Sequence, residues 1–173
     1  METMTLRIFQ REIERQCRFA IIAAGELTEG LTNDNQDLAW YAMQNLLIAI
    51  GNVSKIFWPS KEFKNRGEEL RENLGVEDDC PLRPRGFRDS FEHFDERLEK
   101  WAKSSERHNF IDSNIAGPND IAGVDVKDYL RNFDPSSWTL TFRGDEYELR
   151  PPIEAIQNLY PRVSTEANKP WWE

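Results

Sequence analysis

Arg88 and His93 are the two residues whose types and spacing point most directly to a chemical reaction. They stand five positions apart in the segment RGFRDSFEHFDERLEKW, and His93 is one of only two histidines in the chain. An imidazole exchanges protons near neutral pH, and a guanidinium keeps its charge and can grip phosphate oxygens. Cleavage of RNA without a metal needs a base at the 2′-hydroxyl and a cation at the scissile phosphate. The pair therefore fits that reaction.

Further charged residues surround this pair. Asp89 precedes His93 by four positions and Arg97 follows it by four, so both would be its neighbours on a helix surface. Arg83 and Arg85 stand at the start of the segment, where the N-terminus of a helix favours anions. We interpret these two arginines as candidate phosphate-binding residues.

Other interpretations of His93 stay open. It could be a surface histidine of a salt-bridged helix, paired with Asp89 or Glu96. One imidazole among carboxylates, without paired Glu-x-x-His motifs on other helices, is a poor metal site, so we expect no metal and no cofactor. Cys17 and Cys80 have no metal or redox spacing and are typical of reduced thiols in a cytoplasmic protein.

The elements that would carry these residues are helices. Apolar residues at helical spacing predict a fourth helix from about Pro84 to Ser104, and we expect its core face to consist of Phe87, Phe91, Phe94, Leu98 and Trp101. Three helices would precede it, at about 6–27, 36–57 and 61–74. Asp34 or Asn35 can cap the second of these helices, and Gly75 is a candidate terminator of the third.

The pattern changes after the fourth helix. Residues 108–124 look like a loop, and 126–133 fit a short helix or a strand. Alternating apolar residues over 138–149, with a turn at Gly144, predict a β-hairpin, and 153–160 fits a last short helix. The predicted fold class is therefore mainly α, an up-and-down four-helix bundle over residues 1–107. The C-terminal extension, residues 108–173, would pack its hairpin on the bundle to make one structural domain.

A row of arginines follows the first helix. They recur at three and four residues, opposite the apolar stripe, and are Arg7, Arg11, Arg15 and Arg18. Such a row fits a solvated face whose positive charge is partly balanced by nearby glutamates. It also fits a ridge that faces phosphate.

Composition limits the classes of partner. The 173 residues include 22 Lys+Arg and 31 Asp+Glu, a net charge of −9, which opposes nonspecific binding to nucleic acid. The start of the chain lacks the order of a signal peptide, and the most apolar window, residues 38–58, contains too many polar residues for a membrane span. We expect a cytoplasmic protein that does not bind membranes.

The run Arg88-Asp89-Ser90-Phe91-Glu92-His93 resembles the R-x4-6-H motif of HEPN domains, which has a polar residue directly after the arginine. The wider run is similar to a helix of uncharacterised bacterial proteins. The resemblance covers about residues 6–107 and implies a small helical bundle. Many members of the family are metal-independent ribonucleases, often toxins, that dimerise to build the site.

By this resemblance Arg88 and His93 would be the catalytic pair, and Asp89 would hold the polar position that supports them. Glu92 and Arg97 would be further supporting candidates. The implied partners are a second copy of the chain, RNA, and a cognate antitoxin or another protein. The alternative is a noncatalytic helical module that binds RNA or a protein through the fourth helix and the aromatic hairpin.

Overall fold

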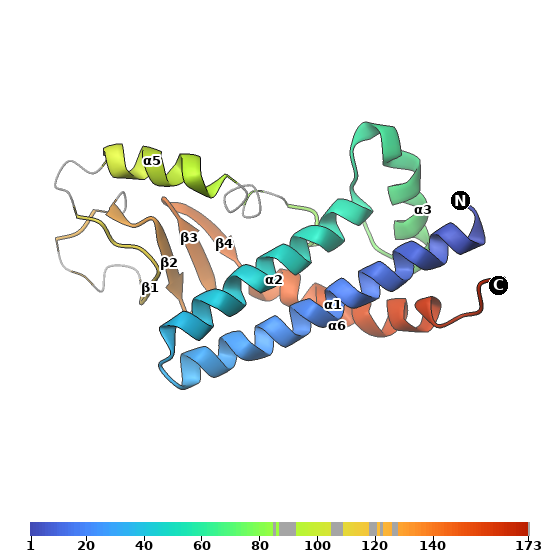
Figure 1. Cartoon of the computed structure of the whole chain (residues 1–173), viewed down its shortest axis with the longest axis horizontal. Coiled ribbons are helices and arrows are strands. Elements are labelled where there is room, and N and C mark those ends of the chain that lie inside the picture. Colours follow the sequence, from blue (N-terminus) through green and yellow to red (C-terminus); the bar gives the residue numbers. More distant parts are fainter. Residues whose placement is uncertain are drawn as a thin grey trace. The chain divides into compact units, whose positions relative to one another are not determined.

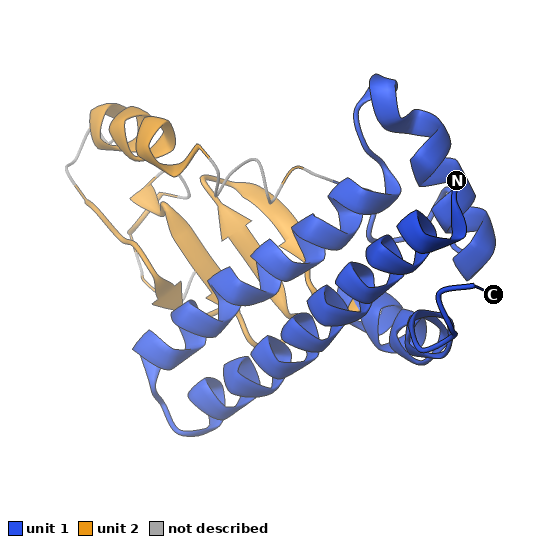
Figure 2. Cartoon of the chain, turned by 45° about the vertical axis from the view of Figure 1, so that its right-hand side comes forward, with its two compact units in different colours: residues 1–85, 151–173 blue, residues 86–150 orange. Residues whose placement is uncertain are grey.

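The computed structural model describes residues 1–84, 86, 93–104, 109–117, 121, 123–125 and 128–172. Within these residues the chain is mainly helical with a small four-stranded sheet (Figure 1), so the predicted class is confirmed at that level. The chain forms two compact units (Figure 2). Unit 1 comprises Met1–Arg85 and Pro151–Glu173, and unit 2 comprises Gly86–Arg150. These boundaries differ from the division that the sequence suggested at residue 107.

A long antiparallel helical hairpin dominates unit 1. Helix α1 spans Thr3–Thr32 and helix α2 spans Gln36–Phe57, and the two lie side by side in Figure 1. The Asn35 side chain accepts a hydrogen bond from the backbone nitrogen of Leu38 and so caps α2; of the two candidate caps, Asp34 and Asn35, it is the second. The helices approach closely at Gly30, where an added Cβ would lie 2.6 Å from the backbone nitrogen of Ala39.

The third helical segment was also predicted correctly. A 3-10 turn, η1 (Lys61–Phe63), leads into α3 (Lys64–Leu74). Gly75 ends α3 in the left-handed conformation, with φ of 59°, which glycine adopts without steric cost. Arg71 on α3 donates a hydrogen bond to the carbonyl of Phe57, and this contact ties α3 to the end of α2.

The last helix is longer than the sequence suggested. Helix α6 spans Arg150–Ala167 and continues through Pro161, although we expected it to end at Tyr160. A proline within a helix costs about 3 kcal/mol. The apolar stripe explains why the helix continues, since its buried positions lie on both sides of the proline: Pro152, Ile156, Leu159, Val163 and Ala167. Burial of this stripe outweighs the proline.

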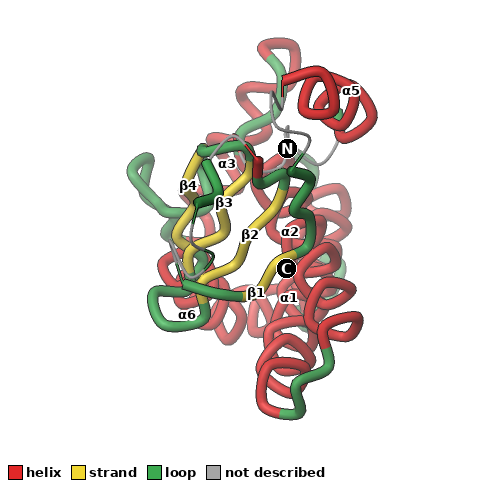
Figure 3. The backbone as a smooth tube through the Cα atoms, turned by 90° about the vertical axis from the view of Figure 1, so that its left-hand side faces the viewer, coloured by secondary structure: helices red, strands yellow, loops and turns green. Residues whose placement is uncertain are grey.

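Unit 2 holds the sheet and helix α5 (Phe94–Ser104). The strands are β1 (Asn114–Ile115), β2 (Arg131–Asp134), β3 (Thr139–Phe142) and β4 (Asp145–Glu148), in the order β1-β2-β3-β4 (Figure 3). β1 runs parallel to β2, and the other neighbours are antiparallel. The two strands expected within 138–149 therefore form part of a four-stranded sheet, and the ambiguous segment 126–133 supplies a strand.

The parallel pairing of the short strand β1 depends on side-chain amides. Asn114 donates to the side-chain oxygen of Asn132 at 2.6 Å, and Asn132 donates to the carbonyl of Ala116 at 3.2 Å. Between β3 and β4, Arg143 and Gly144 both have positive φ, which is typical of a tight two-residue hairpin turn.

Helix α5 packs on the sheet of unit 2. Trp101 is buried with Leu130 and Phe142, and Phe94 packs against this cluster. The structure thus describes the predicted fourth helix from Phe94 to Ser104, and this part covers the sheet with its apolar face. The predicted four-helix bundle is not confirmed. Leu98, which we expected in the core, is exposed. Phe87 and Phe91 lie outside the described residues.

Two glycines of α1 allow a matched test of the α1–α2 contact. We expect Gly30→Ala to destabilise the protein by about 1–3 kcal/mol, because the new methyl group would overlap the backbone at Ala39. Gly25 has open space around its Cβ position, so Gly25→Ala should stabilise the same helix by about 0.5–1 kcal/mol. Urea denaturation of both variants measures the difference. Equal stabilities would contradict the close approach.

Candidate functional site

His93 lies at the N-terminal entry of α5. The residue directly precedes the first helical residue, Phe94, and its carbonyl accepts a hydrogen bond from the backbone nitrogen of Arg97 at 3.2 Å. The side chain is 64% exposed. His93 therefore occupies a helix entry open to solvent, whereas the sequence had placed it in mid-helix.

Two charged residues of α5 lie close to this imidazole. Glu96 places a carboxylate oxygen 3.8 Å from Nδ1 of His93, too far for a hydrogen bond. Glu96 also lies 3.7 Å from the ammonium of Lys100. The pairing of His93 with Glu96 is one of the two alternatives that the sequence left open.

Arg97 turns toward the sheet of unit 2. Its guanidinium carbon lies 5.5 Å from the centre of the Phe142 ring, within the range of a cation–π contact. The side chain is partly buried. Arg97 thus helps to hold α5 on the sheet, and this packing role is the one its contacts support.

The other predicted site residues are placed as follows. Arg83 belongs to unit 1, where its exposed guanidinium donates a hydrogen bond to the carbonyl of Asp78 at 2.8 Å. The remaining four candidates lie outside the described residues: Arg85, Arg88, Asp89 and Glu92. Among the described candidates, His93 and Arg97 lie on successive turns at the start of α5. Glu96, which was not a predicted site residue, lies beside His93.

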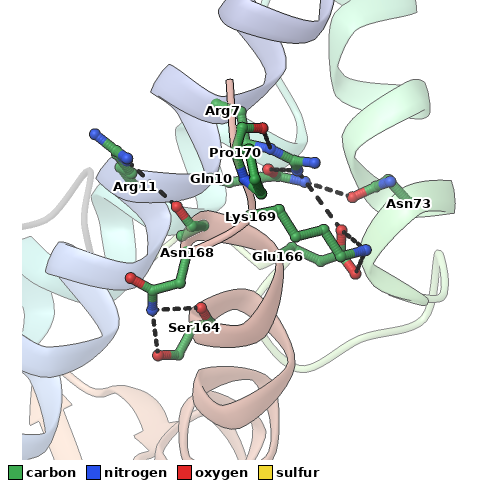
Figure 4. A network of polar contacts seen from close by, with 10 residues as sticks. Arg7, Gln10, Arg11, Asn73, Ser164, Glu166, Asn168, Lys169 and Pro170 are labelled. Carbon is green, nitrogen blue, oxygen red and sulfur yellow. Dashed lines mark hydrogen bonds and ion pairs between the residues drawn. The ribbon is translucent and has the colours of Figure 1, made fainter. Parts of the chain in front are cut away.

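The arginine row of α1 is neither a uniform solvated face nor a phosphate ridge. Arg7 is 2% exposed and donates to the side-chain oxygen of Gln10 at 2.6 Å. It also donates to the carbonyl of Pro170 and lies 3.6 Å from the carboxylate of Glu166 (Figure 4). Arg7 therefore links the first helix to the last, and no spacing rule on α1 alone could have indicated this contact.

The neighbouring arginines and polar residues extend this link. Arg11 donates to the carbonyl of Ala167 at 3.3 Å and stacks 3.9 Å from the Trp171 ring. Gln10 donates to the side-chain oxygen of Asn73 on α3 at 2.6 Å (Figure 4). These contacts fix the C-terminal segment, including the Trp171 side chain, to α1. The cluster is structural, since its cations are already satisfied by the chain's own carbonyls and carboxylates.

The two thiols are not placed for nucleophilic catalysis. Cys17 is fully buried on α1, and this burial raises the pKa of its thiol to about 12, so it stays protonated at neutral pH. Burial also raises the pKa of Cys80. In the part of the chain that the structure describes, no group of three His, Cys, Asp or Glu residues is arranged as metal ligands.

Comparisons with known proteins found no similar protein. A scan against protein-family models found no match, and searches of curated proteins and of solved structures found none either. Across the described residues, no helix has the length and apolar character needed to cross a membrane.

The buried arginine can be tested against an exposed one on the same helix. We expect Arg7→Ala to lower the free energy of unfolding by about 2–3 kcal/mol, because it removes a buried ion pair and leaves Gln10 short of a donor. Arg15 pairs with Glu12 at 2.7 Å on the surface, so Arg15→Ala should change stability by no more than about 0.5 kcal/mol. Thermal and urea unfolding of both variants give the comparison. Similar losses in both would contradict the assigned role of Arg7.

Thiol labelling tests the burial of Cys17. At mildly alkaline pH, iodoacetamide should modify the partly buried Cys80 and leave Cys17 unreacted until the protein unfolds. Mass spectrometry of peptides, with and without denaturant, identifies the modified site. Rapid labelling of Cys17 in the folded protein would show that α1 does not bury it.

Proposed function

We propose that this chain is a metal-independent endoribonuclease of HEPN type, in which His93 and Arg88 act together and two copies build one composite site. The observation that carries the proposal is the position of His93, a solvent-exposed imidazole with the Glu96 carboxylate beside its Nδ1 atom. The His93 side chain is 64% exposed, so a substrate could reach it. The family relation and its up-and-down four-helix arrangement belong to the same proposal.

The reaction requires an imidazole that can take up a proton. His93 would accept the proton of the 2′-hydroxyl as O2′ attacks phosphorus. The bond from phosphorus to O5′ then breaks, and O5′ takes a proton, which leaves a cyclic phosphate and a free 5′-hydroxyl. The Glu96 carboxylate would lie beside the imidazolium that forms on His93, and Arg88 would stabilise the charge on the phosphate oxygens.

The negative charge of the protein opposes RNA binding at this site. A net charge of −9, with Asp95 and Glu96 in the first turn of α5, repels an RNA backbone. Binding would therefore depend on local cations, and Arg83, Arg85 and Arg88 are the candidates. The proposal predicts weak, strongly salt-dependent RNA binding.

A second candidate function rests on a different observation. Large apolar side chains of α1 and α2 are exposed in unit 1, among them Phe19, Ile22, Tyr41 and Ile48. Such side chains suit a noncatalytic helical module that binds a protein partner, for which a cognate antitoxin is one possibility. This function needs no reaction at His93, so a cleavage assay separates the two candidates.

The test is RNA cleavage in the presence of EDTA. We expect the wild type to cut RNA, and His93→Ala and Arg88→Ala each to lower the rate by at least about 100-fold, the usual contribution of a positioned acid–base group. His108→Ala is the matched control, because it removes the other histidine, which has no arginine at the motif spacing. Circular dichroism checks that every variant folds.

The outcomes are distinct. Cleavage lost in His93→Ala and Arg88→Ala but kept in His108→Ala supports the nuclease. Equal cleavage by all four proteins, or no cleavage by the wild type over a broad RNA panel, would remove the site assignment and leave the binding module.

A further inference from the structure

Strand β4 (Asp145–Glu148) lies at one edge of the sheet of unit 2. In the strand order β1-β2-β3-β4 it pairs with β3 on one side, and no other strand of the described sheet lies on its second side (Figure 3). An unpaired edge offers a row of backbone donors and acceptors to an extended chain. The opposite edge strand, β1, has only two residues, so β4 is the longer of the two edges.

The hydrogen-bond pattern shows which backbone groups of β4 face away from β3. Just beyond the strand, the N–H of Leu149 donates to the carbonyl of Trp138 at 2.9 Å. In an antiparallel pair every second residue bonds to the partner strand, so Tyr147 shares the direction of Leu149. The N–H and C=O groups of Glu146 and Glu148 therefore point outward. Within the described part of the chain, no backbone hydrogen bond reaches them from another segment.

The side chains of this edge are mostly acidic. Asp145, Glu146 and Glu148 are exposed, and none of the ion pairs among the described residues includes any of the three. Because side chains alternate along a strand, Glu146 and Glu148 project from one face of the sheet and Tyr147 from the other. Tyr147 packs against the buried cluster that contains Trp101. The edge thus has an acidic face and an aromatic face.

The charge of this edge determines which extended chains can pair with it. Charged residues on edge strands prevent association with similar edges. A second copy of β4 would bring carboxylates against identical carboxylates, and a nucleic acid would bring phosphates, so both are repelled. A strand with basic side chains places opposite charges directly across from each other, which stabilises the pair. The unpaired carboxylates therefore favour a basic partner.

We propose that β4 binds an extended basic segment of another protein by strand addition. The backbone of this segment pairs with the outward groups of Glu146 and Glu148, and its basic side chains lie beside the two carboxylates. The residue between the two basic ones projects to the other face, where it lies beside Tyr147, and it is therefore apolar. The recognised pattern is basic, apolar, basic.

The two kinds of contact have different roles in this complex. Backbone hydrogen bonds give strand addition its affinity, and the side chains on alternating faces give its specificity. Exposed ion pairs contribute little each and are screened by salt. We therefore expect weak binding that decreases as the salt concentration rises. The inference does not rest on the ribonuclease proposal, because it requires neither RNA nor a reaction at His93.

Amide hydrogen exchange of the full chain tests the pairing directly. The probe is a capped synthetic peptide of sequence Lys-Val-Lys-Val-Lys at low salt. In the free protein, the amide of Tyr147 should exchange slowly, because it bonds to β3, and those of Glu146 and Glu148 should exchange fast. Saturating peptide should slow the exchange of the two glutamate amides by roughly tenfold or more.

Charge reversal tests the choice of partner. The double variant Glu146→Lys, Glu148→Lys should weaken binding of the fluorescently labelled peptide by roughly tenfold or more. The double variant Glu29→Lys, Glu62→Lys makes the same change in net charge at exposed positions of unit 1. It should change the Kd by less than about threefold, because charges far from the peptide are screened. Circular dichroism checks that both variants fold.

A second pair of variants separates the backbone from the charge. Glu148→Gln removes the carboxylate alone, whereas Glu148→Pro also removes the outward N–H. Proline is tolerated at an edge position whose N–H does not bond within the sheet. We expect Glu148→Pro to weaken peptide binding more than Glu148→Gln. The same peptide with methylated backbone nitrogens keeps its charges but cannot donate to β4, so it should not bind measurably.

Four results would overturn the inference. One is no binding of the basic peptide to the folded wild type at low salt. Another is a methylated peptide that binds as tightly as its parent, since charge alone would then explain binding. The third is exchange that stays fast at Glu146 and Glu148 when peptide is bound. The fourth is an equal loss of affinity in the two charge-reversal variants.

Discussion

Unit 1 is closed by contacts between the first and last helices of the chain, and the buried guanidinium of Arg7 is at their centre. It joins α1 to the partly exposed Glu166 and Pro170. Arg162 on α6 donates to the carbonyls of Leu74 and Gly75 at the end of α3. Because both ends of the chain belong to one unit, unit 2 is an insertion that leaves unit 1 after residue 85 and returns at residue 151. Unit 2, which contains the sheet and α5, is thus joined to unit 1 by the chain at both of its ends.

Local signals predicted the elements whose stability is decided locally. Helix α2, its Asn35 cap and the Gly75 terminator of α3 follow from spacing and from the conformations that these residues prefer. The sequence failed where distant contacts decide. We expected the last helix to end at Tyr160, but α6 continues through Pro161, because buried residues from Ile156 to Val163 lie on both sides of the proline.

The candidate site shows the same division. The sequence indicated that His93 and Arg97 would be neighbours. They are one turn apart, and the backbone nitrogen of Arg97 donates to the carbonyl of His93. It could not indicate that α5 would pack on the sheet, because Trp101 and Phe94 would suit any apolar partner. The arginine row of α1 was expected to face solvent or phosphate, because a guanidinium is normally exposed. The sequence of α1 could not show that carbonyls and carboxylates far along the chain bind these side chains. The exposure of Phe19 and Ile22 could have been predicted from the sequence, because they are large apolar residues outside the buried stripe of their helix.

Nuclear magnetic resonance of the two histidines is the most direct test of the proposal that RNA binds at His93. With the imidazoles isotopically labelled, a 2′-O-methyl oligonucleotide that cannot be cleaved is titrated into the protein at low salt, and His93 is identified by its alanine variant. We expect the ring signals of His93 to shift with oligonucleotide concentration and added salt to reverse the shift. Signals of His93 that do not move at any concentration, in a protein that is folded and at low salt, would contradict it.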